Sequence, residues 1–266
     1  MEPDEHTSAL EREGAALASA AGRRGLSAPV PACPGWQVRD LLRHIGYVHR
    51  WAATYVGQAR QEMIDEPPES EILQGGPADA ELLGWFRDGL GELVGTLRSA
   101  DPGLTCWTFF AAPSPLAFWA RRQAHETAIH RADAEGAPGD AGTPPGPSPV
   151  TPFPAAFAAD GVDELLTGFA PRARFRAGAD HGGSRLRLLV QAADTGDAWL
   201  TEIGARVTAQ RCGEPAQAAA AECVLAGPAS DLYLALWNRQ PMADPVTVTG
   251  DAAVLALWRD RIRVTW

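Results

Sequence analysis

The sequence predicts a two-domain protein, with an N-terminal four-helix bundle followed by a small α+β domain. Apolar residues recur at helical spacing in four stretches of residues 1–135. The segment 136–154, GAPGDAGTPPGPSPVTPFP, contains seven prolines and four glycines, a composition typical of a semi-rigid linker. In residues 155–266, short segments alternate apolar and polar side chains, as half-exposed strands do.

Within the first domain we expect helices near 6–22, 37–63, 79–99 and 114–135. The second helix follows the Pro34-Gly35 turn, and its apolar residues recur at helical spacing: Val38, Leu41, Leu42, Ile45, Val48, Ala52 and Tyr55. An acidic loop is expected at 67–70. In the second domain, strands are predicted at 185–192, 205–211, 222–226 and 246–249, and helices at 230–238 and 251–259. These strands predict an antiparallel sheet.

The segment 124–131 holds the best candidate for a metal site. Glu126 and His130 are four residues apart, so a helix places them on one face. They continue a stripe that starts apolar and turns polar, formed by Leu116, Trp119, Gln123, Glu126, His130 and Asp133. A carboxylate that faces a helical core is costly unless it is paired or bound to a metal. The neighbouring His125 only mimics the H-E-x-x-H zinc-peptidase signature, because it lies about 140° round the helix from His130.

His44 is the best candidate for a third ligand, since it lies at the edge of the apolar stripe of the second predicted helix. Two histidines and one glutamate would leave an open position on zinc, as catalytic sites do. Two alternatives to a metal site remain open. The Glu126–His130 pair could simply be solvated, and His44 could simply be hydrogen-bonded. His49, about 140° from His44, is not expected to be a ligand, and His125 is expected to be exposed or beside the ligands.

Composition restricts the possible partners. The formal net charge of −10 argues against nucleic acid, and all 23 basic residues are arginines. No apolar run reaches transmembrane length and the N-terminus is acidic, so neither a membrane span nor a signal peptide is expected. The four cysteines show no C-x-x-C spacing, which predicts a reduced, cytoplasmic protein. Cys33 is expected to be structural rather than a nucleophile.

Two motifs carry a family resemblance: CPGWQVRDLLRHIG at 33–46 and FWARRQAHETAIHRADAE at 118–135 resemble the mycothiol-dependent maleylpyruvate isomerase family. The segments AADGVDE at 158–164 and GPASDL at 227–232 look like its C-terminal domain. The resemblance implies a DinB-like metal-binding bundle, a sterol-carrier-like second domain, and His44, Glu126 and His130 as ligands of zinc or another divalent metal. Gln37 departs from the family, which usually has serine or threonine as the helix N-cap there. Because glutamine caps poorly, the start of this helix is left open.

The same resemblance implies mycothiol as a thiol cosubstrate. A zinc-bound thiol loses its proton and becomes a nucleophile, so we expect attack on a small electrophilic molecule. We favour S-transfer over isomerisation of maleylpyruvate. A hydrolase that uses zinc-bound water and a non-catalytic metal-binding protein are the alternatives. The chain is expected to be a monomer or a homodimer.

Three further residues are candidates for binding or catalysis. Trp36 and Trp119 could contact the sugar-based thiol, although each fits an apolar core as well. Arg239 falls where the family has an arginine implicated in catalysis from across the interdomain cleft, with Asn238 at a position where glycine is common. Arg239 would then recognise an anionic substrate. A cation that stabilises a helix C-terminus is the equal alternative.

Overall fold

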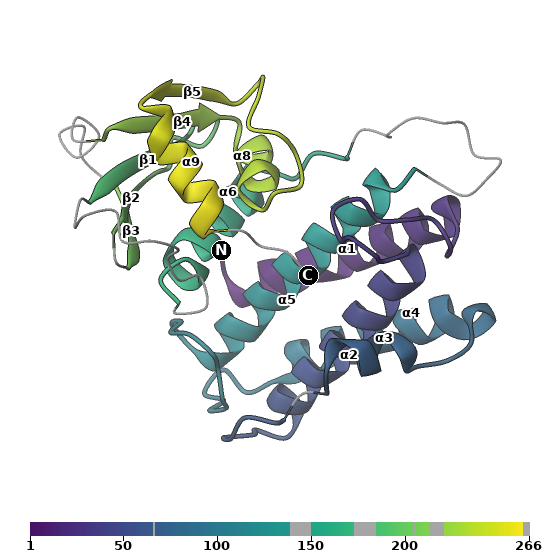
Figure 1. The fold of residues 1–266 in the computed structure, drawn as a ribbon. Coiled ribbons are helices and arrows are strands. Elements are labelled where there is room, and N and C mark those ends of the chain that lie inside the picture. Colours follow the sequence, from purple (N-terminus) through teal and green to yellow (C-terminus); the bar gives the residue numbers. More distant parts are fainter. Residues whose placement is uncertain (66, 139–149, 173–184, 205, 213–220, 263–266) are drawn as a thin grey trace. The chain divides into compact units, whose positions relative to one another are not determined.

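The computed structural model describes residues 1–65, 67–138, 150–172, 185–204, 206–212 and 221–262. The chain divides into two compact units, Met1–Thr151 and Pro152–Trp266, each with its own helices or sheet (Figure 1). Most of the predicted linker, residues 139–149, lies outside the described residues. The predicted fold class, helical first and α+β second, is confirmed.

The described part of the first unit is a bundle of four long helices: α1 (Pro3–Arg24), α2 (Val38–Gly57), α4 (Asp79–Ser99) and α5 (Pro115–Gly136). Both α1 and α2 pack against α4 and α5. Local sequence determines where two of them begin. The Asp40 carboxylate accepts a hydrogen bond from the Gln37 backbone N–H at 2.8 Å, which is the bond that the N3 residue supplies in a capping box at the start of α2. The Ser114 hydroxyl accepts from Ala117 N at 3.1 Å at the start of α5.

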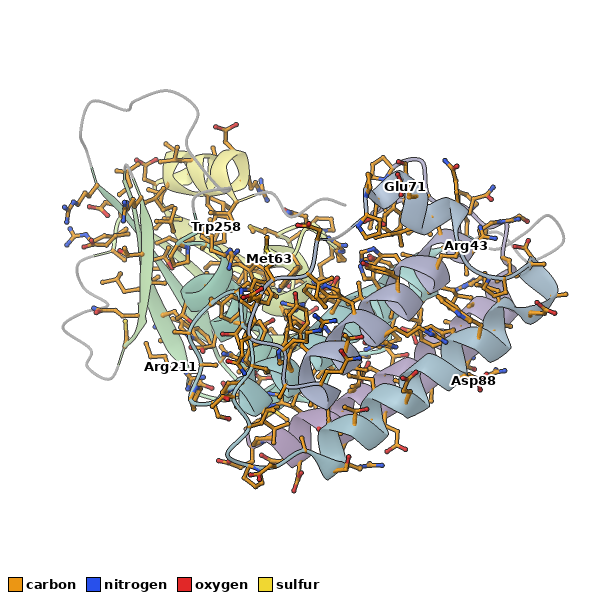
Figure 2. The ribbon with its side chains drawn as sticks, turned by 90° about the horizontal axis from the view of Figure 1, so that it is seen from below. Arg43, Met63, Glu71, Asp88, Arg211 and Trp258 are labelled. Atoms are coloured by element: carbon orange, nitrogen blue, oxygen red, sulfur yellow. The ribbon has the colours of Figure 1, made fainter. Side chains whose placement is uncertain are left out.

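The prediction that the second helix extends to residue 63 is wrong, because α2 ends at Gly57. Arg60 N donates to Tyr55 O at 3.1 Å, and Ala59 has a positive φ of 48°, so the helical pattern stops there. Residues beyond Gly57 have no apolar face to bury, and Met63 is 62% exposed (Figure 2). The predicted acidic loop is also shorter than expected, since the short helix α3 (Glu69–Gln74) begins within it.

The helix that carries His44 is packed tightly against α4. A Cβ on Gly46 would collide with the Trp85 ring, so glycine permits the close approach. The Arg50 guanidinium lies 4.0 Å from the centre of the Trp85 ring and donates to the Trp85 carbonyl at 2.7 Å. These contacts hold α2, and with it His44, at a defined depth in the bundle.

The second unit begins with α6 (Ala155–Asp163), which continues into a π-helical turn at Glu164–Phe169. Its five described strands are β1 (Leu186–Ala192), β2 (Ala198–Ile203), β3 (Val207–Arg211), β4 (Cys223–Gly227) and β5 (Thr247–Gly250). They form one sheet in the order β3-β2-β1-β4-β5. The helix α8 (Ala229–Leu236) packs on α6, whereas α9 (Ala252–Arg261) contacts β1 and β4.

The expectation of an antiparallel sheet is wrong for one pair. β1 runs parallel to β4, with Leu189 beside Val224, and the other neighbouring strands are antiparallel. β2 was not expected either, because its burial does not alternate: Trp199, Leu200 and Thr201 are buried in succession. Residue 205, the first of a predicted strand, lies outside the described residues. No helix in the described ranges has the length and apolar character that a membrane crossing requires.

The α2–α5 interface contains a fully buried histidine that is not a candidate ligand. His49 Nε2 lies 2.8 Å from the Thr127 hydroxyl. Burial lowers the pKa of His49 to about 3, and the nearby Arg50 charge acts in the same direction. His49 is therefore neutral in the folded protein at any pH near neutrality.

This buried histidine predicts acid sensitivity. The folded-state pKa is below the unfolded value of about 6.5, so its contribution to stability is complete above pH 6.5 and is lost as the pH falls towards 3. When the pH falls from 7 to 5, the free energy of unfolding should decrease in both proteins, but by roughly 2 kcal/mol less in His49→Gln than in the parent. Urea unfolding at both pH values measures this difference. Equal losses in the two proteins would show that His49 does not titrate on unfolding.

A second prediction concerns Gly250, which has a φ of +93° and whose added Cβ would collide with the Glu222 carbonyl oxygen. Gly196 also has a positive φ, of +77°, but an added Cβ there meets no atom within 4 Å. Gly196→Ala should therefore lower the free energy of unfolding only by the backbone strain, about 1–2 kcal/mol. Gly250→Ala should cost about 1–3 kcal/mol more, because the backbone must also move. Thermal and urea unfolding of both variants test this, and equal losses would contradict it.

Candidate metal centre

Helix α5 is buried on all sides although it carries many charged residues. The whole stretch 122–135 is buried, including Arg122, Glu126, Arg131, Asp133 and Glu135. Arg122 therefore does not lie on the helix surface, since it is only 3% exposed. Buried charges must be paired, hydrogen-bonded or bound to a metal, so the contacts of these residues indicate what the helix does.

The three predicted metal ligands lie together. One donor atom from each of His44, Glu126 and His130 lies within 4.8 Å of the other two, and all three residues are buried. His44 Nε2 and His130 Nε2 are 3.4 and 3.6 Å from the same oxygen, Glu126 Oε1. The spacing of four residues on α5 brings Glu126 and His130 to one face, and α2 supplies His44 from the adjacent helix.

Each of these side chains makes a second polar contact on its outer side. Arg122 Nη2 donates to Glu126 Oε2 at 2.8 Å, which leaves Oε1 facing the two imidazoles. His44 Nδ1 lies 2.9 Å from Glu69 Oε1, and His130 Nδ1 lies 2.9 Å from Asp133 Oδ2. Both Nε2 atoms and one carboxylate oxygen therefore converge on one point. Two imidazole nitrogens and one carboxylate oxygen form a donor set that suits zinc and leaves an open position, so the residues fit a divalent metal.

The electrostatics of the group are consistent with a cation at that point. Burial alone would raise the pKa of Glu126, but Arg122 and hydrogen bonds from His130 and His44 hold it well below its usual range. Burial alone would lower the pKa of His44, yet hydrogen bonds with Glu126 and Glu69 raise it to about 9. Glu126 is thus ionised, and without a metal His44 carries a proton between the two groups. A metal ion bound there would take the place of that proton.

The two candidate tryptophans differ in where they lie. The Trp36 ring is 5.2 Å from the His44 ring and is stacked at 6.2 Å from the His130 ring, centre to centre. Trp119 lies two helical turns before Glu126, about 10 Å along the axis of α5. It is buried among Trp51, Tyr55 and other aromatic rings, and its Nε1 donates to the Trp107 carbonyl at 3.0 Å. Of the two candidate tryptophans, Trp36 is therefore the one that lies beside candidate ligands, namely His44 and His130.

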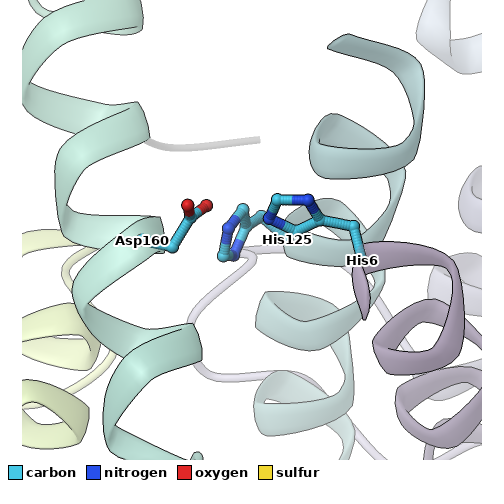
Figure 3. A group of neighbouring side chains, drawn as sticks. All are labelled: His6, His125 and Asp160. Atoms are coloured by element: carbon cyan, nitrogen blue, oxygen red, sulfur yellow. The ribbon is translucent and has the colours of Figure 1, made fainter. Parts of the chain in front are cut away.

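The remaining buried histidines have other neighbours. His125 is 0% exposed, so the first of the two expectations for it, an exposed side chain, is wrong. Its ring meets that of His6 on α1 edge to face, with centres 5.9 Å apart (Figure 3). Cys33 is also buried, and its sulfur lies 3.6 Å from Asp133 Oδ2. The group Cys33, His130 and Asp133 is likewise compact enough to hold a cation, but it shares His130 with the first group.

Sequence reasoning missed two partners of the candidate ligands. Asp133 was the last member of the predicted stripe, and its position three residues after His130 could have indicated contact with that ring. Glu69 had no comparable signal, because it comes from a separate segment and reaches His44 through the tertiary fold.

In the second unit, Arg239 is positioned by the end of α8. Asn238 N donates to Ala235 O at 3.1 Å and Arg239 N to Leu234 O at 2.8 Å, the paired bonds of a Schellman motif. Asn238 has a φ of 61°, a conformation that glycine or asparagine adopts most easily, which explains asparagine at this position. Arg239 Nη1 also donates to the Trp237 carbonyl at 2.8 Å, and the side chain is half-buried.

Comparisons with known proteins agree with this architecture. Residues 7–135 match the mycothiol maleylpyruvate isomerase N-terminal domain, and residues 156–257 match the MDMPI C-terminal domain. A crystal structure of the mycothiol-dependent maleylpyruvate isomerase is similar, with a TM-score of 0.65 and 14% identity over 100% of this chain and 98% of that chain. A histidine-to-alanine mutant of such an enzyme matches with the same TM-score and coverage at 13% identity.

These structural matches have low identity and show the fold alone, and no curated protein sequence matches significantly. The two domain models, however, cover most of the chain in the expected order. The chain therefore belongs to the mycothiol maleylpyruvate isomerase family.

Proposed function

We propose that this protein is an enzyme that binds one divalent metal ion, most readily zinc, through His44, Glu126 and His130. The observation that supports it is the convergence of His44 Nε2, His130 Nε2 and Glu126 Oε1, with each side chain held from behind by a second polar contact. The family match supports mycothiol as the thiol cosubstrate. When bound, zinc with an open position lowers the pKa of a coordinated thiol, so that the sulfur is nucleophilic at neutral pH.

The residues of the chain would prepare this chemistry before any substrate binds. Arg122 keeps Glu126 ionised and directs Oε1 towards the histidines. Burial excludes water from the ligands, which strengthens their interaction with a cation. Trp36 covers one side of both imidazole rings and restricts their rotation. We propose two contacts of the thiol's sugar portion: Trp36, beside the two histidines, and Trp119, about 10 Å from Glu126 along α5.

Two outcomes of thiol attack fit this proposal. In isomerisation, the sulfur adds to an activated double bond, the resulting single bond rotates, and the sulfur is eliminated again. In S-transfer, the sulfur displaces a leaving group or opens an electrophile and stays attached. The family name supports isomerisation. We propose S-transfer to another small electrophile as the second possible reaction, because one scaffold often supports several reactions.

A direct assay separates these possibilities. The zinc-loaded protein is incubated with mycothiol and either maleylpyruvate or a panel of alkyl halides and epoxides, and the products are analysed by mass spectrometry. A product of unchanged mass that separates from maleylpyruvate on liquid chromatography, with the thiol recovered, indicates isomerisation, and a thioether adduct indicates S-transfer. Turnover that persists without any thiol would instead indicate a hydrolase that uses metal-bound water.

The metal site predicts a stoichiometry. The purified or reconstituted protein should carry about one divalent metal per chain. His130→Ala should lose the metal, because the three-ligand set is broken. His125→Ala, which removes a buried histidine from the same helix, should retain it. Elemental analysis of the three proteins measures this. Absence of metal in the reconstituted parent, or loss of metal only in His125→Ala, would contradict the assignment.

We also propose that Arg239 recognises an anionic group of the substrate. Loss of a charge-assisted hydrogen bond costs about 1.5–3 kcal/mol, so Arg239→Ala should lower turnover roughly ten- to a hundredfold. Its metal content should be unchanged, because Arg239 belongs to a different unit from the candidate ligands. Arg185→Ala is the matched control, since Arg185 is a strongly exposed arginine of the same unit. Full activity of Arg239→Ala would contradict the proposed role.

A further inference from the structure

One face of α5 carries a continuous row of polar side chains that extends beyond the proposed metal ligands. Arg122, Glu126, His130 and Asp133 follow one another at intervals of four, four and three residues, which keeps them on the same side of the helix. Arg122 contacts Glu126 at 2.8 Å, and Asp133 contacts His130 at 2.9 Å. The proposed ligands thus lie between a cation and an anion of the same helix.

Asp133 is placed to determine which nitrogen of His130 is available. Its side chain is 0% exposed, and Oδ2 is 2.9 Å from His130 Nδ1. The buried Cys33 sulfur lies 3.6 Å from the same oxygen and can donate its S–H to it. An ionised carboxylate only accepts hydrogen bonds, so this contact places a proton on Nδ1. The lone pair of a neutral His130 is then on Nε2, the atom that faces Glu126.

Glu69 makes the equivalent contact with His44 from outside the bundle core. Its Oε1 lies 2.9 Å from His44 Nδ1, so His44 also presents Nε2 to the common point. The environment differs, however, because the Glu69 side chain is 42% exposed whereas that of Asp133 is fully buried. Water can replace an exposed acceptor but has no access to a buried one.

We infer that Asp133 and Glu69 are positioning residues that hold His130 and His44 in the Nε2-ligating tautomer, with Asp133 the more important of the two. This inference rests on the proposed metal site, and it assigns roles to two residues that do not touch the metal themselves. Carboxylate partners of ligating histidines typically contribute 10- to 100-fold to metal affinity. Cys33 supports the same arrangement as a donor to Asp133.

The test uses the full chain and measures Zn²⁺ affinity by competition with a chromogenic chelator. Asp133→Asn keeps the size of the side chain but removes its charge, and should weaken Zn²⁺ binding about 10- to 100-fold. Glu69→Gln should weaken it less, by about two- to tenfold, because water can take over the contact. Glu71→Gln is the matched control, since Glu71 lies on the same helix as Glu69, α3, and is exposed (Figure 2). It should bind like the parent.

A spectroscopic readout separates positioning from a general loss of stability. In the Co²⁺-substituted parent, the Nδ1–H protons of His44 and His130 should give two solvent-exchangeable, paramagnetically shifted proton signals. Asp133→Asn should alter the shift or exchange rate of one signal, and Glu69→Gln that of the other. A folded Asp133→Asn variant with Zn²⁺ affinity within twofold of the parent and both signals unchanged would overturn the inference.

The outcomes also distinguish this inference from the proposed function. A parent protein that binds no Zn²⁺ would overturn both. A parent that binds Zn²⁺ through His44, Glu126 and His130, with Asp133→Asn and Glu69→Gln unaffected, would leave the metal site standing and overturn the positioning roles alone. Equal weakening by Glu69→Gln and the control Glu71→Gln would overturn the role of Glu69, since it would reflect disturbance of α3.

Discussion

The structure of the first unit depends on the need to pair the charges of a fully buried helix. α5 occupies the inside of the bundle, yet it carries arginines, carboxylates and histidines along most of its length. Leaving one of these charges without a partner would cost several kcal/mol. The helix therefore has to be surrounded by complementary groups from α1, from α2 and from its own neighbouring turns. The bundle therefore buries these paired charges beside a hydrophobic core, to which Leu17, Leu41 and Phe86 belong.

Two separate networks meet this need. Arg131 reaches Glu13 on α1 at 2.9 Å and Glu135 on α5 at 2.6 Å, and both carboxylates are largely buried. On the other side of the helix, Glu126 is paired with Arg122 and faces His44 and His130. In the first network, the Arg131–Glu13 pair joins α5 to α1, and Glu135 pairs with Arg131 within α5. The second contains one carboxylate and two imidazoles that share a single point, an arrangement that structural pairing alone does not require.

The sequence was most informative where the chemistry lies on one helix. Glu126 and His130 are visible as a pair because helical periodicity converts their spacing directly into proximity. His44 came from a second helix: its place at the edge of an apolar stripe made it a candidate, and the resemblance of two motifs to a family supported its link to the pair. Glu69 could not be foreseen, because its contact with His44 depends on how α3 folds back on α2. The parallel pairing of β1 with β4 was hidden for a related reason, since alternation along a strand says nothing about the direction of its neighbour.

The contacts of Thr151 have a consequence for engineering. Thr151 N donates to Glu135 Oε2 at 2.8 Å and its carbonyl accepts from Arg131 Nη1 at 2.7 Å, so the chain is tied back to the end of α5 before it enters the second unit. Both ends of the intervening segment are thus held by the first unit itself. Lengthening a closed loop costs little, about 0.6 kcal/mol for each doubling. The Pro- and Gly-rich stretch between Gly136 and Thr151 is therefore a natural place to insert an affinity tag or a fluorescent reporter without altering either unit.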